Sequence, residues 1–185
     1  MMHEGIWLGA AIVVGYLLGT LPVAIVVAGR WGVDPTTAGS GNPGATNVLR
    51  TAGRTAGIVT LAGDVAKGAA AAGIGWAVGG RELALACGMA AVVGHVAPAT
   101  RRFRGGKGVA TGFGMTSATF PLAAVAGVVW FYVIRALMGR PSVASQAAIV
   151  TLPAVAAASG ASWREITVCA AGAVVVLAKL LCTRA

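Results

Sequence analysis

The sequence contains few charged residues and very few acidic ones. Five Asp and Glu stand against fourteen Lys and Arg, and charged residues make up only 10% of the 185 residues. A soluble domain usually has about 25% charged residues, so this composition argues against one. Hydrophobic residues instead make up 57% of the chain. The composition therefore predicts a membrane protein, with lipid as the solvent along most of its length.

Cysteine and histidine are also scarce, which excludes the common metal and redox sites. Cys87, Cys169 and Cys182 lie in apolar surroundings without the paired spacing of a zinc or redox site. His3 and His95 are too far apart to form a local ligand pair. We expect no metal and no cofactor, and we expect the three cysteines to be small buried hydrophobic residues.

The formal charge of +9 raises the question of nucleic-acid binding. Lys and Arg lie mainly at the ends of apolar stretches, as in the cytoplasmic loops of membrane proteins. No region remains that could fold as a separate nucleic-acid-binding domain. We therefore predict one membrane domain over residues 1–185 and no nucleic-acid partner.

Apolar stretches recur along the chain and predict an all-α polytopic membrane protein with about seven transmembrane helices. The first stretch is longer than a signal-peptide core and follows no basic segment, so we expect it to be retained. The fourth is only about 20 Å long as a helix, too short to cross a hydrocarbon core of about 30 Å alone, so we expect it to pack between neighbouring helices. The polar segments between the helices are expected to be short, and re-entrant or interfacial. The seven stretches are residues 6–28, 55–78, 83–99, 108–120, 122–138, 143–159 and 166–181.

The basic residues predict the orientation of these helices. Seven spans place the two chain ends on opposite sides, and Lys67 lies within a span. Arg81 and Arg164 then fall on one face, beside Glu82 and Glu165. Eleven basic residues fall on the other: Arg30, Arg50, Arg54, Arg101, Arg102, Arg104, Lys107, Arg135, Arg140, Lys179 and Arg184. Because cytoplasmic loops are rich in Lys and Arg, we predict that this face is cytoplasmic and the N-terminus lies outside.

Several pairs of glycines are spaced four residues apart within the predicted helices. Such spacing places small residues on one helix face, where two backbones can approach closely. The general abundance of glycine, 28 of 185 residues, explains these pairs equally well. The pairs are Gly15 with Gly19, Gly53 with Gly57, Gly75 with Gly79, and Gly108 with Gly112.

The first polar segment, Gly39 to Arg50, is rich in glycine and hydrogen-bonding side chains. Its glycines match the dinucleotide-binding spacing G-x-G-x-x-G, but no strand precedes them, so that interpretation fails. We predict instead an anion site at a short helix that Asn42 caps and Pro43 begins. Asn47 and Arg50 would share one face of that helix and converge on one phosphate or carbonyl. The alternative is a solvated connecting loop.

The second polar segment runs from Gly94 to Thr111. It is not a Walker loop, because Arg101 replaces the first glycine and Gly108 the Ser or Thr after the lysine. Its glycines nevertheless predict exposed backbone donors at the start of the fourth helix, where Lys107 adds a full charge and a phosphate would bind. We interpret Arg101, Arg102 and Arg104 as charges that hold the loop in the cytoplasm.

Three further polar residues lie within predicted spans or near their ends. Asp64 and Lys67 are three residues apart on one face of the second span and can pair within the membrane. Such a pair is either structural or functional. His95, near the end of the third span, either acts as an acid or base near neutral pH or hydrogen-bonds within the bundle.

Taken together, these residues resemble the bacterial membrane glycerol-3-phosphate acyltransferases of the PlsY family. The resemblance extends from about Leu18 to Ile149. The residues that carry it are Ser40-Gly41-Asn42, Gly44-Ala45-Thr46-Asn47 with Arg50, Asp64 with Lys67-Gly68, Gly94-His95 with Pro98, Gly105-Gly106-Lys107-Gly108-Val109-Ala110-Thr111 and, more weakly, Ser142-Val143-Ala144-Ser145.

The resemblance implies acyl transfer from acyl-phosphate to the sn-1 hydroxyl of glycerol 3-phosphate, in phospholipid biosynthesis. The products would be lysophosphatidic acid and inorganic phosphate, and the reaction would need neither metal nor coenzyme A. The implied partners are both substrates, membrane lipid and the soluble enzyme that forms acyl-phosphate. Because acyl-phosphate is already activated, the site need mainly orient the hydroxyl, stabilise the oxyanion and receive the phosphate.

The resemblance also implies roles for individual residues. Whether Ser40 is a nucleophile or an orienting group stays open, since no His-Asp pair is placed to activate it. The expected catalytic residues are Ser40, Asn42, Arg50 and Lys107; the phosphate-binding residues are Gly105, Gly106, Lys107, Gly108 and Thr111; the glycerol-phosphate pocket has Asn47, Arg140 and Ser142; and His95, Asp64 and Lys67 are in support.

The sequence departs from the family pattern in two places. Family members usually carry His, Arg and Asn in a C-terminal stretch, whereas residues 177–185 contain no His or Asn. Pro141 also replaces an aromatic residue. Two alternatives therefore stay open: a non-catalytic homologue that binds acyl-phosphate, and a small transporter for phosphorylated anions, suggested by Asp64 and Lys67 within a span.

Overall fold

The computed structural model describes the backbone of residues 2–182, and their side chains except those of residues 2–4, 141 and 142. Every regular element in this range is helical, which confirms the all-α prediction. The elements are α1 (Met2–Thr20), α2 (Val23–Gly29), α3 (Ala45–Thr51), α4 (Arg54–Val96), the 3-10 turn η1 (Ala99–Arg101), α5 (Val109–Thr119), α6 (Pro121–Met138), α7 (Pro141–Ala158) and α8 (Trp163–Cys182).

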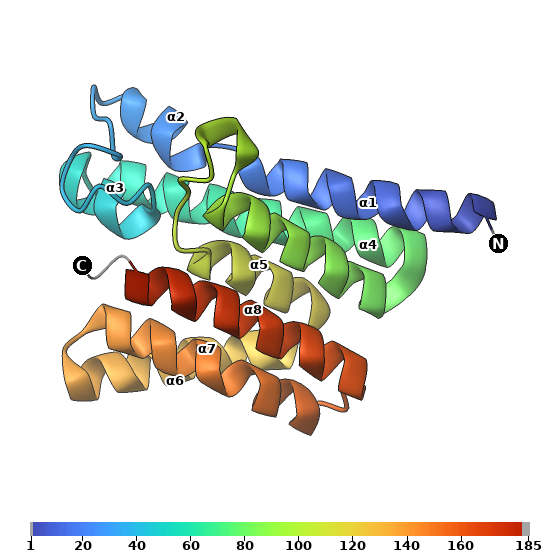
Figure 1. Ribbon diagram of the computed structural model, residues 1–185. Helices are drawn as coiled ribbons and strands as arrows, with labels where there is room; N and C mark the ends of the chain where they lie inside the picture. The colour runs from blue at the N-terminus through green and yellow to red at the C-terminus, as the bar shows by residue number, and fades with distance from the viewer. Residues whose placement is uncertain (1, 183–185) are drawn as a thin grey trace.

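The long element α4 is two helices joined at a sharp turn. Gly79 and Gly80 have non-helical backbone angles, with φ of 73° at Gly80. Glycine adopts this left-handed conformation readily because it has no Cβ. The chain reverses there, and the two halves of α4 run back along each other in Figure 1. The predicted spans 55–78 and 83–99 are therefore separate helices, as expected.

Four helical stretches are long and apolar enough to cross a membrane: Gly5–Gly29, Arg54–Arg101, Pro121–Met138 and Trp163–Cys182. The second of these contains both halves of α4. A shorter apolar helix covers Val143–Ala158, and α5 has only eleven residues, as its short apolar stretch predicts. All seven predicted apolar stretches are thus helical.

The first predicted span, 6–28, is wrong in one respect, because it is not one continuous helix. The chain breaks at Leu21 and Pro22, between α1 and α2. Proline has no backbone N–H and clashes with the preceding turn of a helix, so it ends α1. The break leaves the Leu21 carbonyl oxygen within reach of α4, where Lys67 Nζ donates to it at 3.2 Å.

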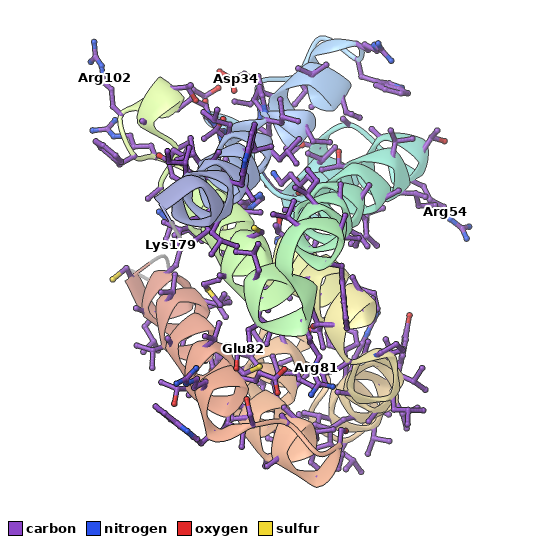
Figure 2. The ribbon with its side chains drawn as sticks, turned by 90° about the vertical axis from the view of Figure 1, so that its right-hand side faces the viewer. Asp34, Arg54, Arg81, Glu82, Arg102 and Lys179 are labelled. Carbon is purple, nitrogen blue, oxygen red and sulfur yellow. The ribbon has the colours of Figure 1, made fainter. Side chains whose placement is uncertain are left out.

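The polar segments gather at one end of the bundle. Figure 1 shows α3, the α4–α5 connection, the α6–α7 turn and the end of α8 toward one end, with the α1 N-terminus and the Gly79–Gly80 turn toward the other. Figure 2, viewed along the helices, shows how the side chains surround them. The predicted grouping of the basic residues at one end is confirmed for those that the structure describes. Arg184 lies outside the described residues.

Small residues bring α4 close to α1 and α5. A Cβ on Gly19 would collide with the backbone of Ala91, and a Cβ on Gly15 with the backbone of Cys87. This confirms the close helix approach predicted for the first glycine pair. In the first half of α4, a Cβ on Gly68 would collide with the Thr111 carbonyl of α5. The three helices therefore form the tightly packed half of the bundle.

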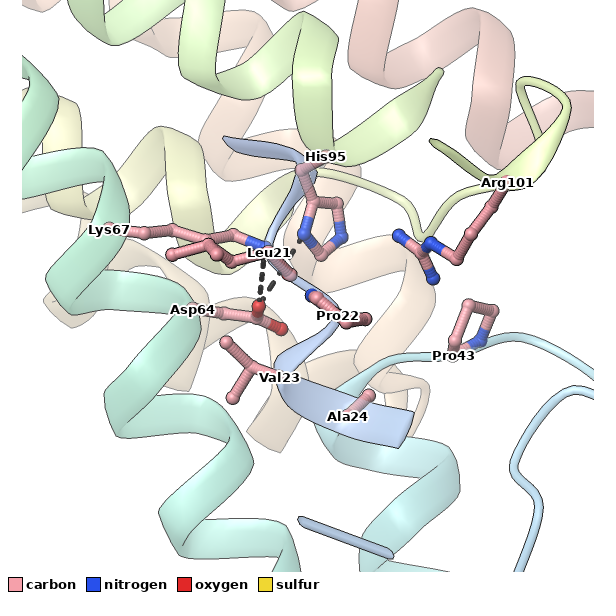
Figure 3. A pocket seen from close by; sticks show the side chains of 9 residues that line it. All are labelled: Leu21, Pro22, Val23, Ala24, Pro43, Asp64, Lys67, His95 and Arg101. Carbon is pink, nitrogen blue, oxygen red and sulfur yellow. Dashed lines mark hydrogen bonds and ion pairs between the residues drawn. The ribbon is translucent and has the colours of Figure 1, made fainter. Parts of the chain in front are cut away.

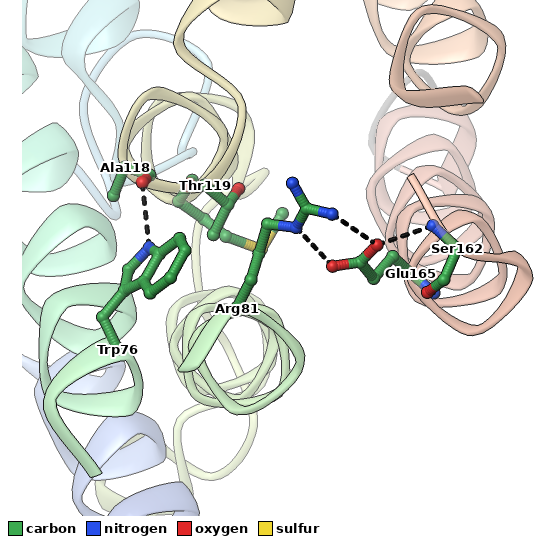
Figure 4. Close-up of polar contacts among 7 residues, drawn as sticks. Trp76, Arg81, Ala118, Thr119, Ser162 and Glu165 are labelled. Atoms are coloured by element: carbon green, nitrogen blue, oxygen red, sulfur yellow. Dashed lines mark hydrogen bonds and ion pairs between the residues drawn. The ribbon is translucent and has the colours of Figure 1, made fainter. Parts of the chain in front are cut away.

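Polar contacts fasten the opposite end of the bundle, shown in Figure 4. Arg81 donates through Nη2 to Glu165 Oε2 at 3.1 Å and stacks over the Phe120 ring. The Ser162 N–H also donates to Glu165, at 2.7 Å. Arg81 and Arg164 therefore pair across helices, with Glu165 and Glu82 respectively, rather than with their sequence neighbours.

The cysteine prediction is right for two residues and wrong for one. Cys87 and Cys169 are buried, whereas Cys182 is exposed. Cys182 is the last residue of α8 and lies beyond Leu180, the final buried residue of that helix among those described. Its immediate neighbour Leu181 is exposed as well, so the last two residues of α8 lie outside the core.

Candidate functional site

The first polar segment folds differently from the predicted capped helix. Helix α3 begins at Ala45 with Gly44 as its N-cap, so Asn42 does not cap it and Pro43 does not begin it. The Gly44 N–H instead donates to the Asn42 carbonyl at 2.9 Å. This tight turn keeps the chain extended at Gly44 and delays the helix by two residues.

Asn47 organises the loop that precedes α3. Its side-chain Oδ1 accepts from the Ser40 N–H at 2.9 Å, and its Nδ2 donates to the carbonyls of Pro35 and Ala38, each at 2.9 Å. The side chain is only 2% exposed. Because one amide holds three backbone groups, it fixes the position of Ser40.

Arg50 lies on the same short helix but faces solvent. The predicted convergence of Asn47 and Arg50 on one ligand group is therefore wrong, because Asn47 faces the loop interior. Ser40 is exposed beside them, and Asn42 is partly buried. Among the described residues, no donor reaches the buried Asn42 Oδ1. This acceptor is free to receive a hydrogen bond from a ligand.

One acid also shapes this loop. The Thr36 hydroxyl and N–H donate to Asp34 Oδ1 at 2.7 and 2.9 Å. These two bonds, the hydroxyl's first, lower the pKa of the Asp34 carboxyl below its ordinary value, so it is ionised at neutral pH.

The glycines of the second polar segment close its loop onto the end of α4. The Gly105 N–H donates to the Val96 carbonyl and the Gly106 N–H to the His95 carbonyl, each at 3.1 Å. Contrary to the sequence-based expectation, these two N–H groups therefore do not face a ligand. A Cβ on Gly105 would collide with the His95 carbonyl, so only glycine fits here.

Gly106 lies where the two polar segments meet. A Cβ there would collide with the His95 ring and lie 3.0 Å from the Pro43 carbonyl oxygen. Gly108 caps α5 with φ of 83°, and Lys107, between the two, is partly buried. The start of α5, with its positive dipole end and this lysine, therefore adjoins the Pro43 turn.

Thr111 does not line an open site. It is fully buried, and its backbone carbonyl packs against Gly68 of α4. Among the described residues, no hydrogen-bond partner reaches the Thr111 Oγ1, so its expected role in phosphate binding stays a prediction.

Buried beneath the two segments is the charged cluster shown in Figure 3, formed by Asp64, Lys67 and His95. Lys67 Nζ lies 2.8 Å from Asp64 Oδ1, and His95 Nδ1 lies 3.5 Å from the same oxygen. All three residues are buried. The predicted Asp64–Lys67 pairing is confirmed, and His95 joins it. This cluster connects both halves of α4 to the α1–α2 break through Leu21.

Two residues of this region were not identified from the sequence as site residues. Arg101 lines the same narrow pocket as Asp64 and His95, whereas Arg102 and Arg104 are exposed. Tyr16 of α1 uses its hydroxyl to donate to the Ala97 carbonyl at 3.0 Å and to accept from the Ala99 N–H at 2.9 Å. Both residues contact residues that are far away in the sequence, so no local sequence pattern predicts these contacts.

The third expected group lies apart from the others. Arg140 is exposed and immediately precedes α7. In Figure 1 the end of α8 lies between the α6–α7 turn, which contains Arg140, and α3. Ser142 is the second residue of α7, but its side chain lies outside the described residues.

Comparison with known proteins gives consistent matches along the chain. A family model described as glycerol-3-phosphate acyltransferase matches residues 9–183. A glycerol-3-phosphate acyltransferase of Laribacter hongkongensis is 43% identical over 183 residues, which cover 95% of this chain and 87% of that protein. One of Halorhodospira halophila is 43% identical over 144 residues, covering 77% and 73%.

Two solved structures share the fold. One is a crystal structure of PlsY (YgiH), an integral membrane glycerol 3-phosphate acyltransferase, in its glycerol 3-phosphate form, with a TM-score of 0.88 and 29% identity. The other is its lysophosphatidic acid form, with a TM-score of 0.87 and 29% identity. Each comparison covers 93% of this chain and 87% of that chain.

Proposed function

This chain belongs to the glycerol-3-phosphate acyltransferase family, and from that premise we propose how its two polar segments share the reaction. The protein is an integral membrane enzyme of phospholipid synthesis that acylates glycerol 3-phosphate. The acyl donor, the roles of individual residues and the orientation in the membrane form the proposal.

The proposed donor is acyl-phosphate, and the acceptor atom is the sn-1 hydroxyl oxygen. That oxygen attacks the acyl carbonyl carbon, and the bond from this carbon to the phosphate oxygen then breaks. The hydroxyl proton passes to the leaving phosphate, so the products are lysophosphatidic acid and inorganic phosphate. Because the donor is activated, orientation and charge stabilisation can supply most of the acceleration.

The two polar segments meet at Gly106, which packs against His95 and Pro43. The proposed roles of the two segments rest on this observation. Lys107 and the start of α5 would bind the donor phosphate, since both are electropositive and adjoin this point. Arg50 would bind the phosphate of the acceptor from α3, with the bidentate geometry that arginine offers. A phosphate-bearing substrate on each segment brings donor and acceptor together at the segment boundary.

Ser40 and Asn42 would orient the acceptor hydroxyl. Ser40 is exposed and fixed through Asn47, and the free Asn42 Oδ1 can accept the hydroxyl proton in a hydrogen bond. His95 is buried beside Asp64, in a position that supports the loop rather than activates Ser40. We therefore propose an orienting role for Ser40 and a supporting role for Asp64, Lys67 and His95.

The segments would face the cytoplasm, because the described basic residues gather at their end of the bundle. This placement lets soluble glycerol 3-phosphate and the soluble acyl-phosphate-forming enzyme reach the site. Arg140 and Ser142 would contribute to the acceptor pocket only if a bound substrate or a movement of α7 bridges the gap to α3.

The test is acyl transfer by the purified full-length chain. With acyl-phosphate and glycerol 3-phosphate, we expect lysophosphatidic acid and inorganic phosphate in equal amounts. Acyl-coenzyme A replaces acyl-phosphate as the control donor and should give no product. Binding of acyl-phosphate without product would identify a non-catalytic homologue. Uptake of glycerol 3-phosphate into liposomes without any donor would favour the transporter hypothesis instead.

A further inference from the structure

The connection between α4 and α5 carries a loop that the proposed reaction does not use. We call residues 99–104 the Arg102 loop. Its base is closed by the bond from the Gly105 N–H to the Val96 carbonyl, and the Tyr16 hydroxyl binds both Ala97 and Ala99. The loop is therefore fixed to α1 at one side and to the end of α4 below.

The tip of the loop has an unusual backbone. Arg102 and Phe103 are consecutive non-glycine residues with positive φ, 50° and 61°. Such residues visit the left-handed region singly and at a cost, so two in sequence store strain. Hydrogen bonds from the Phe103 N–H to the Pro98 carbonyl and from the Arg104 N–H to the Arg101 carbonyl hold the tip in this form.

This backbone conformation directs one side chain of the loop inward and three outward. Arg101 faces inward, to the pocket it shares with Asp64 and His95. Arg102 and Arg104 are exposed, and Phe103 is 65% exposed. Among the described residues, neither Arg102 nor Arg104 has an ion-pair partner. The tip thus presents two free guanidinium groups around one exposed aromatic ring.

The length of α1 indicates that the loop lies near a membrane surface. Helix α1 has nineteen residues, so it is about 28 Å long, close to the hydrocarbon thickness of about 30 Å. Tyr16 lies in the last turn or so of α1, which ends at Thr20, and it anchors the loop at that level. Figure 1 shows the loop projecting sideways from the bundle beside the α1–α2 break. In Figure 2, Arg102 points outward from the edge of the bundle.

We propose that the Arg102 loop binds the phosphate headgroup of an anionic phospholipid in the surrounding bilayer. Arg102 and Arg104 match a phosphate in charge and geometry, and Phe103 would lie at the boundary between headgroups and acyl chains, where aromatic side chains concentrate. Anionic lipids attract basic side chains at this depth. A bound lipid would also stabilise the strained backbone of the tip, because this backbone conformation directs Arg102, Arg104 and Phe103 toward the lipid.

The charges are tested by lipid retention. The full-length protein is purified in detergent with equal amounts of phosphatidylglycerol and phosphatidylcholine, and bound lipids are counted by native mass spectrometry. For Arg102→Gln/Arg104→Gln we expect phosphatidylglycerol binding to weaken on the order of tenfold, with phosphatidylcholine unchanged. The matched control is Arg54→Gln/Arg135→Gln, which removes two exposed charges elsewhere at the same end. Equal loss in both variants, or no loss in the loop variant, would overturn the proposal.

A second measurement leaves the charges intact and tests depth. A fluorophore is attached at Phe103→Cys, with Cys182→Ser removing the exposed native thiol. In nanodiscs of phosphatidylcholine and phosphatidylglycerol, a phospholipid carrying a headgroup spin label should quench this fluorophore strongly. The same fluorophore at Thr36→Cys, an exposed residue three positions before the first polar segment, should be quenched little. Quenching at residue 103 no stronger than at residue 36 would place the loop in water and overturn the proposal.

Discussion

Lys67 Nζ lies 2.8 Å from Asp64 Oδ1 and donates to the Leu21 carbonyl oxygen at 3.2 Å. One ammonium group therefore neutralises a carboxylate inside a membrane span and also binds a carbonyl at the α1–α2 break. This double contact ties the first half of α4 to the point from which α2 leads toward the polar segments. We infer that the buried pair supports the site through α2.

Lys67→Met should destabilise the protein strongly, because it leaves Asp64 as an uncompensated buried charge. Breaking one partner of a buried pair costs about 3–5 kcal/mol. The measurement is thermal unfolding in detergent, with Asp64→Asn/Lys67→Met as the comparison. The double variant should recover part of the loss, since no charge remains unpaired. A double variant as unstable as the sum of the two single changes would contradict this coupling.

Arg50→Ala and Lys107→Ala should each lower the rate of acyl transfer more than tenfold. In the proposed reaction each charge binds a substrate phosphate, and loss of one charge-assisted hydrogen bond costs about 1.5–3 kcal/mol. Initial rates and thermal unfolding are measured together. Arg54→Ala, which removes an exposed arginine at the start of α4, four residues after Arg50, is the control and should keep a near-native rate. Near-native rates for Arg50→Ala and Lys107→Ala would exclude these residues from the site.

Asn47→Asp should disturb the loop before α3 rather than simply remove a ligand. The substitution replaces the amide Nδ2, which donates to the Pro35 and Ala38 carbonyls, by a carboxylate oxygen that cannot donate. Leaving these carbonyls without a donor costs about 1–3 kcal/mol of stability. We expect faster limited proteolysis within residues 35–40 together with reduced acyl transfer. Thr46→Ala, an exposed neighbour on α3, should change neither. Reduced activity with unchanged proteolysis would indicate that Asn47 contacts the substrate directly.

Gly68→Ala should lower the melting temperature, whereas Gly73→Ala should not. A Cβ on Gly68 would collide with the Thr111 carbonyl, so α4 and α5 would have to separate. Gly73 lies in the same helix, and nothing lies within 4 Å of a Cβ placed there. In open space the change to alanine stabilises a helix by about 0.4–1 kcal/mol. Similar melting temperatures for both variants would show that α5 can move away from α4 without loss of stability.

Cysteine labelling in intact cells tests the orientation. In a Cys182→Ser background, an impermeant maleimide should label Glu82→Cys directly, but Thr36→Cys only after permeabilisation. Both positions are exposed and lie at opposite ends of the bundle, while Cys87 and Cys169 are buried. The reverse pattern would place the polar segments outside the cell and remove the cytoplasmic assignment.

The sequence predicts most of the helices, because each is an apolar run long enough to be distinguished from its polar neighbours. It does not predict the break at Pro22, since the residues on both sides are apolar and the run continues to Ala28. The start of α3 is also missed. A favourable cap sequence at Asn42 was outweighed by the turn that brings the Gly44 N–H onto the Asn42 carbonyl.

The candidate site is only partly predictable for a different reason. The Asp64–Lys67 pair follows from helical spacing, which is local. The approach of His95 to Asp64, and the position of Arg101 beside both, depend on the reversal at Gly79 and Gly80. Likewise, nothing near Tyr16 in the sequence indicates that its hydroxyl binds a loop 81 residues away. These contacts arise from packing between distant segments.

The short length of α5 affects how salt acts on the site. It has eleven residues and is joined through Phe120 to α6, which has eighteen, so its start falls short of the end of α6. Gly105, Gly106 and Gly108 are buried there. If the donor phosphate binds beside these buried glycines, as proposed, dissolved counterions would not surround it, so its attraction to Lys107 would be weakly screened, whereas the exposed arginines at the same end are screened within about 8 Å at physiological ionic strength. Raising ionic strength should therefore weaken contacts at the surface of the protein well before it weakens donor binding at the glycine turn.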